Sequence, residues 1–321
     1  MTAHPKRPWV RRAKRIGFMV FLVAVAFLLV RAARAIAWHE VWETLRALDA
    51  ATLASALALT AASYLLYTGY DVAARRYAGH HVPVRKVMTI SFIAYAFALN
   101  IGALVGGAGF RFRMYGREGE PVGRIARVIA FCVATNWIGY IALAGVLFAS
   151  GAIELPPALE LGGWIGTGIG LRVLGFAMLA TTLAYLIACH VTHGRVFHVR
   201  GHHFRFPSPR LALLQIAMAA MNWTLMGLVV ACFLPRTGEA QVLGALLLAS
   251  VATALAHIPS GIGVLEAVFL AMLGHSTPAP QIIAALLAYR ACYYLVPLGA
   301  ANLAFAVLEF NGRRARKRAL R

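Results

Sequence analysis

The feature that most constrains the fold is a series of long, uncharged, apolar runs that repeat along the whole chain. A helix needs ~20 apolar residues to cross the hydrocarbon core of a bilayer, and most of these runs approach that length. The runs cover residues 16–30, 50–70, 87–110, 128–153, 173–189, 211–234, 240–265, 267–289 and 291–308. Because 61% of the 321 residues are hydrophobic and only 13% are charged, one soluble core could not bury this much apolar surface. The sequence therefore predicts an all-α, polytopic integral membrane protein.

The basic residues lie in short clusters between the apolar runs, although the formal net charge is +20. In a soluble domain this charge would suggest nucleic acid, whereas clusters beside apolar runs are typical of the cytoplasmic loops of membrane proteins. We therefore expect membrane phospholipids as partners and no nucleic acid. The cysteines lie inside apolar runs, without metal-ligand spacing, at Cys132, Cys189, Cys232 and Cys292. We expect them to pack in the interior, and we expect no metal site and no cofactor.

The distribution of lysine and arginine predicts that the run 87–110 does not cross the membrane. If every run crossed, the five arginines of segment 110–127 would face outward, against the positive-inside rule. A return to the cytoplasmic side within the run removes this conflict. The stretch "ALNIGALVGGAG" permits the turn because it contains residues that weaken a helix, namely Asn100, Gly102, Gly106, Gly107 and Gly109.

A second re-entrant hairpin is predicted over residues 241–274. The stretch "HIPSGIG" contains Pro259, Gly261 and Gly263, and the apolar sequence after it, "VLEAVFLAML", is too short for an independent span. With both hairpins in place, 25 of the 31 lysines and arginines and both termini are cytoplasmic. Irregular backbone at membrane depth must be buried in protein or line a cavity, so the two hairpins predict an internal site. The alternative is that the glycines only permit close helix packing.

The predicted architecture is therefore about six full spans plus two re-entrant helical hairpins, in an arrangement that an inverted repeat would give. The run 16–30 is interpreted as a retained signal anchor. Arg290 alone interrupts the last two runs, which we expect to form one long helix over 280–308. The chain then consists of a single transmembrane domain with a basic cytoplasmic tail on each side, at 16–310, 1–15 and 311–321.

Glu266 and Arg290 are charges with apolar sequence on both sides. We expect them to face each other, because an unpaired charge at this depth is expensive. One interpretation is a structural salt bridge that fixes the second hairpin. The other is that Arg290, or the exposed amides at the end of the hairpin helix, holds an anionic group. Tyr293, with its neighbours Tyr289 and Tyr294, could hydrogen-bond the same group or simply pack.

The stretch "GGAGFRFRMYGREG" places Arg111, Arg113 and Arg117 directly after glycines, at the expected cytoplasmic surface. A guanidinium beside flexible backbone suits a phosphate, and anchoring to an anionic leaflet is the alternative. A nucleotide loop is excluded, because no GK[ST] follows and no βαβ unit surrounds the stretch. We expect the histidine-rich "HVTHGRVFHVRGHH" to be a solvated loop. No catalytic constellation stands out in the sequence, so we do not expect an enzyme.

Three stretches, "GGAGFRFRMYGREG", "HIPSGIGVLEAVFLAMLG" and "AYRACYYLVPLGAA", resemble the membrane region of bacterial lysylphosphatidylglycerol synthases. That region is the flippase part of multiple peptide resistance factor, and it recurs as a stand-alone flippase-like family. The resemblance covers most of the chain and implies an inner-membrane translocase for anionic or aminoacylated phospholipids. The positions that match the family's signature are Arg111, Gly261, Gly263, Glu266 and Arg290.

The sequence departs from this family at two points. The turn reads "HIPSG" where a second glycine often stands, and the chain ends shortly after the last apolar run without a soluble synthetase domain. We therefore expect this chain not to make aminoacylated lipid itself. Two other functions stay open: a secondary transporter of a small solute, and a membrane partner of an enzyme that acts on lipid-linked sugars. A homo-oligomer or a separate lipid-modifying enzyme also stays open as a partner.

Overall fold

The structure is a computed structural model that describes residues 37–153, 168–192, 195–199, 202–256 and 261–319. Within these ranges the chain is helical, apart from its connecting loops and one hairpin of two short strands. The expected first span at 16–30, the N-terminal tail at 1–15 and Pro259 lie outside the described residues.

Seven helical segments of the described chain are long and apolar enough to cross a membrane. Six are single helices: α3 (Ala50–Ala78), α4 (Val84–Ile101), α6 (Val122–Ser150), α7 (Gly168–Val191), α8 (Pro209–Ala231) and α9 (Glu239–Ala256). The seventh combines three consecutive elements: α11 (Ala279–Tyr289), η4 (Arg290–Leu295), which is a π-helix, and α12 (Val296–Ala319). The prediction of an all-α membrane protein is thus confirmed, and the last two apolar runs do form one long helical segment.

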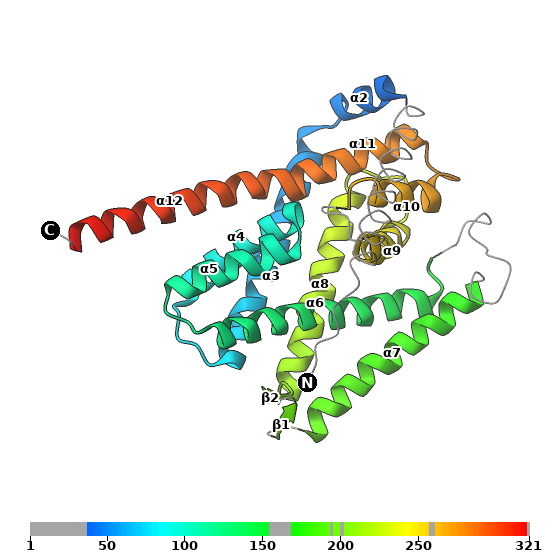
Figure 1. Cartoon of the computed structure of the whole chain (residues 1–321). Helices are drawn as coiled ribbons and strands as arrows, with labels where there is room; N and C mark the ends of the chain where they lie inside the picture. The colour runs from blue at the N-terminus through cyan, green and yellow to red at the C-terminus, as the bar shows by residue number, and fades with distance from the viewer. Residues whose placement is uncertain (1–36, 154–167, 193–194, 200–201, 257–260, 320–321) are drawn as a thin grey trace, which may run out of the picture.

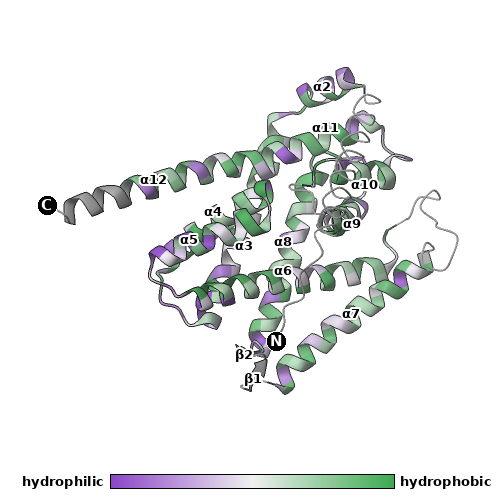
Figure 2. Cartoon of the chain, viewed as in Figure 1, coloured by the Kyte–Doolittle hydropathy of each residue, from purple (hydrophilic) through white to green (hydrophobic). Residues whose placement is uncertain are grey.

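The shorter elements connect or flank these helices. They are α2 (Trp38–Arg46), the π-helix η1 (Ala103–Gly109), α5 (Phe110–Arg117), α10 (Val264–Leu273), β1 (Val196–Val199) and β2 (His202–Arg205). Figure 2 shows hydrophobic residues along the long helices, with hydrophilic residues gathered at α2 and α5. On α7, Val173, Phe176 and Leu183 point apolar side chains away from the protein. Such a surface suits contact with lipid rather than with water.

Helices α3, α6 and α8 pack against one another and form the centre of the molecule, with α4 on α3, α7 on α6 and α9 on α8 (Figure 1). Small residues permit the close approach: a Cβ added at Gly139 of α6 would lie 2.2 Å from the Cβ of Ala219 of α8. Helix α3 begins at an N-cap, because Asp49 Oδ1 accepts a hydrogen bond from the Thr52 amide. It ends at Gly79, whose φ of 70° is in the left-handed region.

The glycine-rich stretch after α4 forms a helical hairpin. The chain reverses at Gly102, whose φ is 94°, and η1 then packs back against α4. A Cβ at Gly106 would lie 2.2 Å from the carbonyl oxygen of Phe97, so only glycine fits this contact. A Cβ at Gly107 would be tight as well, whereas Gly109 meets nothing closer than 3.8 Å. The glycines therefore make both a turn and a close contact, and the entry and exit of this hairpin by one membrane face stay a prediction.

The second glycine-rich stretch separates two helices that pack against each other, α9 and α10. Gly261 and Gly263 adopt φ values of 59° and 81°, which residues with a side chain rarely adopt. A Cβ at Gly261 would also lie 2.6 Å from Thr253 Oγ1. Helix α10 has only 10 residues, as its short apolar stretch predicted, whereas α9 has membrane length. The re-entrant path and the inverted repeat stay predictions.

The histidine-rich segment, expected as a solvated loop, contains a short antiparallel hairpin. Strand β1 pairs with β2, with Val196 opposite Arg205 and Val199 opposite His202. These strands are not evident in the sequence, because four residues are too few to show a clear alternation of apolar and polar positions. The hairpin lies beside the N-terminal end of α8 in Figure 1.

Candidate functional site

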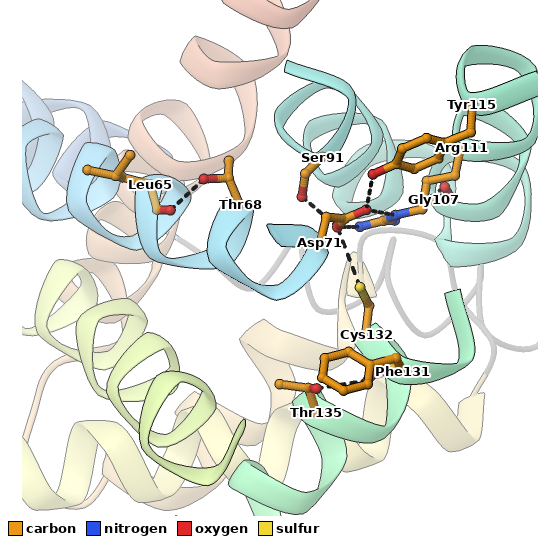
Figure 3. Close-up of polar contacts among 10 residues, drawn as sticks. All are labelled: Leu65, Thr68, Asp71, Ser91, Gly107, Arg111, Tyr115, Phe131, Cys132 and Thr135. Atoms are coloured by element: carbon orange, nitrogen blue, oxygen red, sulfur yellow. Dashed lines mark hydrogen bonds and ion pairs between the residues drawn. The ribbon is translucent and has the colours of Figure 1, made fainter. Parts of the chain in front are cut away.

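A buried carboxylate, that of Asp71 on α3, is the centre of the first charged cluster (Figure 3). Its side chain is 0% exposed, and that of Arg111, on α5, is 4% exposed. Arg111 donates from Nε to Asp71 Oδ1 at 3.0 Å and from Nη2 to Oδ2 at 2.7 Å. This two-point geometry is the strongest form of an arginine–carboxylate contact.

Each oxygen of the Asp71 carboxylate accepts at least two hydrogen bonds. Ser91 of α4 donates to Oδ2 at 2.7 Å, Tyr115 of α5 donates to Oδ1 at 3.1 Å, and the Cys132 thiol of α6 lies 3.5 Å from Oδ2. Arg111 Nη1 also donates to the carbonyl of Gly107 at 3.3 Å. A buried ion pair is tolerated only when such additional bonds offset the loss of water. The cluster therefore ties α3, α4, α5 and α6 to one point.

The second charged cluster contains Glu266 of α10 and Arg290 of η4. Arg290 Nε donates to Glu266 Oε1 at 2.9 Å, and its Nη2 donates to the Gly261 carbonyl at 3.3 Å. The other carboxylate oxygen, Oε2, accepts from the Gly263 amide at 2.7 Å. The expected pairing of Glu266 with Arg290 is therefore confirmed. The bonds also join the long segment α11–η4–α12 to the turn that begins α10.

The two clusters differ in access. The side chains of Glu266 and Arg290 are 21% and 14% exposed, whereas those of Asp71 and Arg111 are almost completely enclosed. The guanidinium of Arg290 also lies 5.7 Å from the ring centre of Tyr294, within the range of a cation–π contact. The second cluster is thus the one that a ligand could reach with the smaller structural change.

A cluster of aromatic side chains lies between the two charged clusters. We call it the tyrosine cluster, and its members are Tyr64, Tyr67, Tyr95, Tyr289, Tyr293 and Tyr294. The rings of Tyr67 and Tyr95 stack with centres 3.5 Å apart, and the hydroxyls of Tyr95 and Tyr293 share a hydrogen bond of 3.0 Å. The Tyr293 hydroxyl also contacts Ser63 Oγ at 2.7 Å, and Ser63 donates to Asn222. This polar chain joins α3, α4, α8 and η4.

The structure separates the arginines that the sequence analysis grouped. Arg111 was expected at the cytoplasmic surface, and it is instead buried against Asp71. Arg113 and Arg117 are about half exposed, and both pair with Glu309 of α12. Tyr293 is completely buried, and its hydroxyl bonds protein groups. Asn100 donates to the carbonyls of Ala96 and Tyr294, so it also helps to fix the end of α4.

Asp71 is the functional candidate that the sequence analysis missed. It directly follows the apolar run 50–70 and lies four residues before Arg75, so in sequence it belongs to the basic segment 71–86. A signal was nevertheless present, because Asp71 is the only acidic residue between Asp49 and Glu118. A lone carboxylate at the end of an apolar run is expensive unless a cation meets it, and Arg111 is that cation.

Comparison with known proteins gives the same family over most of the chain. The family described as lysylphosphatidylglycerol synthase TM region matches residues 16–301. The inner membrane protein YbhN of Escherichia coli (strain K12) is 42% identical over 316 residues, which cover 98% of this chain and 97% of that protein. The uncharacterized protein slr0712 of Synechocystis is 31% identical over 287 residues, which cover 88% of this chain and 87% of that protein.

Proposed function

The chain belongs to the family of the lysylphosphatidylglycerol synthase TM region, and from this membership and its charged clusters we propose that it translocates phospholipids between membrane leaflets. The proposed substrates are anionic or aminoacylated phospholipids. The proposed location is the bacterial inner membrane, with both termini in the cytoplasm. The proposal gives the chain no catalytic step.

The observation that carries the proposal is the partly exposed Glu266–Arg290 pair. Arg290 lies in the π-helix η4, which interrupts a helical segment of membrane length. A guanidinium binds phosphate with the same forked geometry that it uses for a carboxylate. A lipid phosphate that enters here could therefore replace Glu266 as the partner of Arg290. An aminoacylated headgroup also carries an ammonium, which the released Glu266 carboxylate would bind. One pair of side chains thus matches both charges of such a headgroup.

The Asp71–Arg111 pair takes a second role in this proposal. In the structure Arg111 is paired with Asp71 and buried, so its guanidinium is not accessible to a lipid headgroup. Arg111 lies only two residues from Gly109, at the exit of the first hairpin, and a movement of η1 would carry it away from Asp71. The released guanidinium would then recruit a headgroup phosphate on the cytoplasmic side. The carboxylate would hold Arg111 in place when no lipid is bound.

The test is leaflet exchange of a fluorescent phosphatidylglycerol in vesicles that contain the purified protein. The wild-type chain should accelerate exchange over protein-free vesicles, and Arg290→Ala should abolish the acceleration. Arg46→Ala is the matched control, because Arg46 is exposed on α2 and its guanidinium lies over the ring of Trp42, outside both charged clusters. Normal exchange by Arg290→Ala, or equal loss in both variants, would contradict the assignment.

A further inference from the structure

We propose that Tyr64 and Asn100 are positioning residues, which hold η4, and with it Arg290, in register with the first hairpin. The geometry comes from hydrogen bonds that side chains of two other helices donate to the backbone of η4. The expected effect on lipid transport rests on the proposed function.

The long segment changes its hydrogen-bond register just after Arg290. Inside η4 the amide of residue i bonds the carbonyl of residue i−5, as the Val296 amide does with Ala291. Helix α12 then returns to the i−4 pattern, and its second residue, Pro297, has no amide hydrogen to donate. In an α-helical pattern the Tyr293 carbonyl would accept from residue 297, so Pro297 leaves it without that amide donor. An unpaired carbonyl in the membrane interior would cost several kcal/mol, roughly.

Side chains of two other helices donate to carbonyls of η4. The Tyr64 hydroxyl of α3 donates to the Tyr293 carbonyl at 3.0 Å, and Asn100 Nδ2 of α4 donates to the Tyr294 carbonyl at 3.3 Å. Tyr64 is buried, and its ring packs on those of Tyr95 and Tyr293. The backbone of η4 is thus held by hydrogen bonds from two other helices, α3 and α4.

The two donors come from the elements that build the first charged cluster. Tyr64 lies two helical turns before Asp71 on α3, and Asn100 lies two residues before the turn at Gly102. A movement of the first hairpin that releases Arg111 would therefore change the bond that Asn100 makes to η4. Through η4 the movement would reach Arg290, the first residue of that element. Tyr64 and Asn100 would in this way couple the two charged clusters.

The principal test compares Tyr64→Phe with Tyr140→Phe. Both variants remove one buried hydroxyl that donates to a backbone carbonyl, since the Tyr140 hydroxyl bonds the Leu247 carbonyl at 2.9 Å. Hydrogen exchange of the amides of residues 290–296 and 298, measured in lipid nanodiscs, should accelerate about tenfold in Tyr64→Phe, the size of one buried hydrogen bond. It should not change in Tyr140→Phe. Unchanged exchange in Tyr64→Phe would overturn the positioning role, whatever the lipid assay shows.

A second variant separates positioning from simple satisfaction of a carbonyl. Pro297→Ala supplies an amide hydrogen that the Tyr293 carbonyl can accept, but it does not restore the tether to α3. We expect leaflet exchange of phosphatidylglycerol to fall about fivefold to tenfold in Tyr64→Phe and to stay low in Tyr64→Phe/Pro297→Ala. Full recovery in the double variant would show that Tyr64 only satisfies a carbonyl. If the wild-type chain moves no lipid, the proposed function fails, and the amide measurement still decides the positioning role.

Discussion

The buried Asp71–Arg111 pair should dominate the stability of the region that surrounds the first hairpin. Arg111→Met removes the guanidinium but keeps a side chain of comparable length, so Asp71 is left buried and charged. Asp71 then loses two charge-assisted bonds, of 2.7 Å and 3.0 Å, and keeps those from Ser91 and Tyr115. Breaking a buried ion pair on one side costs about 3–5 kcal/mol. We expect Arg111→Met to lower the free energy of unfolding by about this amount.

A double-mutant cycle tests whether the cost comes from the unpaired charge of Asp71. Asp71→Asn keeps the shape of the carboxylate without its charge, and Asp71→Asn/Arg111→Met leaves no buried ion. The double variant should therefore be more stable than the sum of the single effects predicts, by about 2–3 kcal/mol of coupling. Denaturation of the purified protein in mixed detergent micelles, followed by far-UV circular dichroism, gives the four free energies.

An exposed pair gives the control for this cycle. Arg113 and Glu309 form an ion pair of 2.6 Å, but the Arg113 side chain is 54% exposed. Arg113→Met should therefore cost less than about 1 kcal/mol, because water screens such pairs. If the Asp71 and Arg111 effects add to within about 0.5 kcal/mol, the two residues are not coupled. That result would refute the reasoning that the pair is the structural centre of the cluster.

Three further predictions concern pH, glycine contacts and membrane orientation. His80 lies in the turn between α3 and α4, and its burial lowers its pKa below the ordinary 6.5. The unfolded chain then binds the proton more readily than the folded chain, so thermal stability should be highest above pH 6.5 and fall below it. His80→Gln should reduce this loss of stability, which thermal melts at pH 7.5 and 5.5 would measure. Gly106→Ala should lower the yield of folded protein in size-exclusion chromatography, because its Cβ would overlap the Phe97 carbonyl. Gly123→Ala is the control, since a Cβ there meets open space and should not change the yield. Equal yields of the two variants would contradict the contact. Cysteines at positions 113 and 117 should react with a membrane-impermeant maleimide from the cytoplasmic face only, and labelling from outside would contradict the re-entrant path of the first hairpin.

The sequence was sufficient to predict the fold class and one of the two charged clusters. Long apolar runs require helices, because backbone amides in hydrocarbon must be satisfied within the segment. Glu266 and Arg290 stand alone in apolar sequence, so their pairing followed from the cost of an isolated charge. The glycine-rich stretch turns at Gly102 and packs closely at Gly106, while its re-entrant path stays a prediction.

The pairing of Asp71 with Arg111 could not be predicted from the sequence, for a physical reason. Arg111 follows flexible glycines and precedes more arginines, which is how a surface arginine looks in sequence. Its burial depends on Asp71, 40 residues earlier on another helix, and such a contact depends on tertiary packing. The π-helix at Arg290 was equally hidden, because its stabilising donors, Tyr64 and Asn100, are almost 200 residues or more away in the chain.

The most direct test of the central claim is a comparison of headgroups in one exchange assay. Vesicles with and without the purified chain would carry a trace of fluorescent phosphatidylglycerol, lysylphosphatidylglycerol or phosphatidylcholine, and the rate of exchange between leaflets would be measured for each lipid. We predict that the chain accelerates exchange of the anionic or the aminoacylated lipid more than that of phosphatidylcholine, and that Arg290→Ala removes the difference. Rates equal to those of protein-free vesicles for all three lipids would contradict the proposed function.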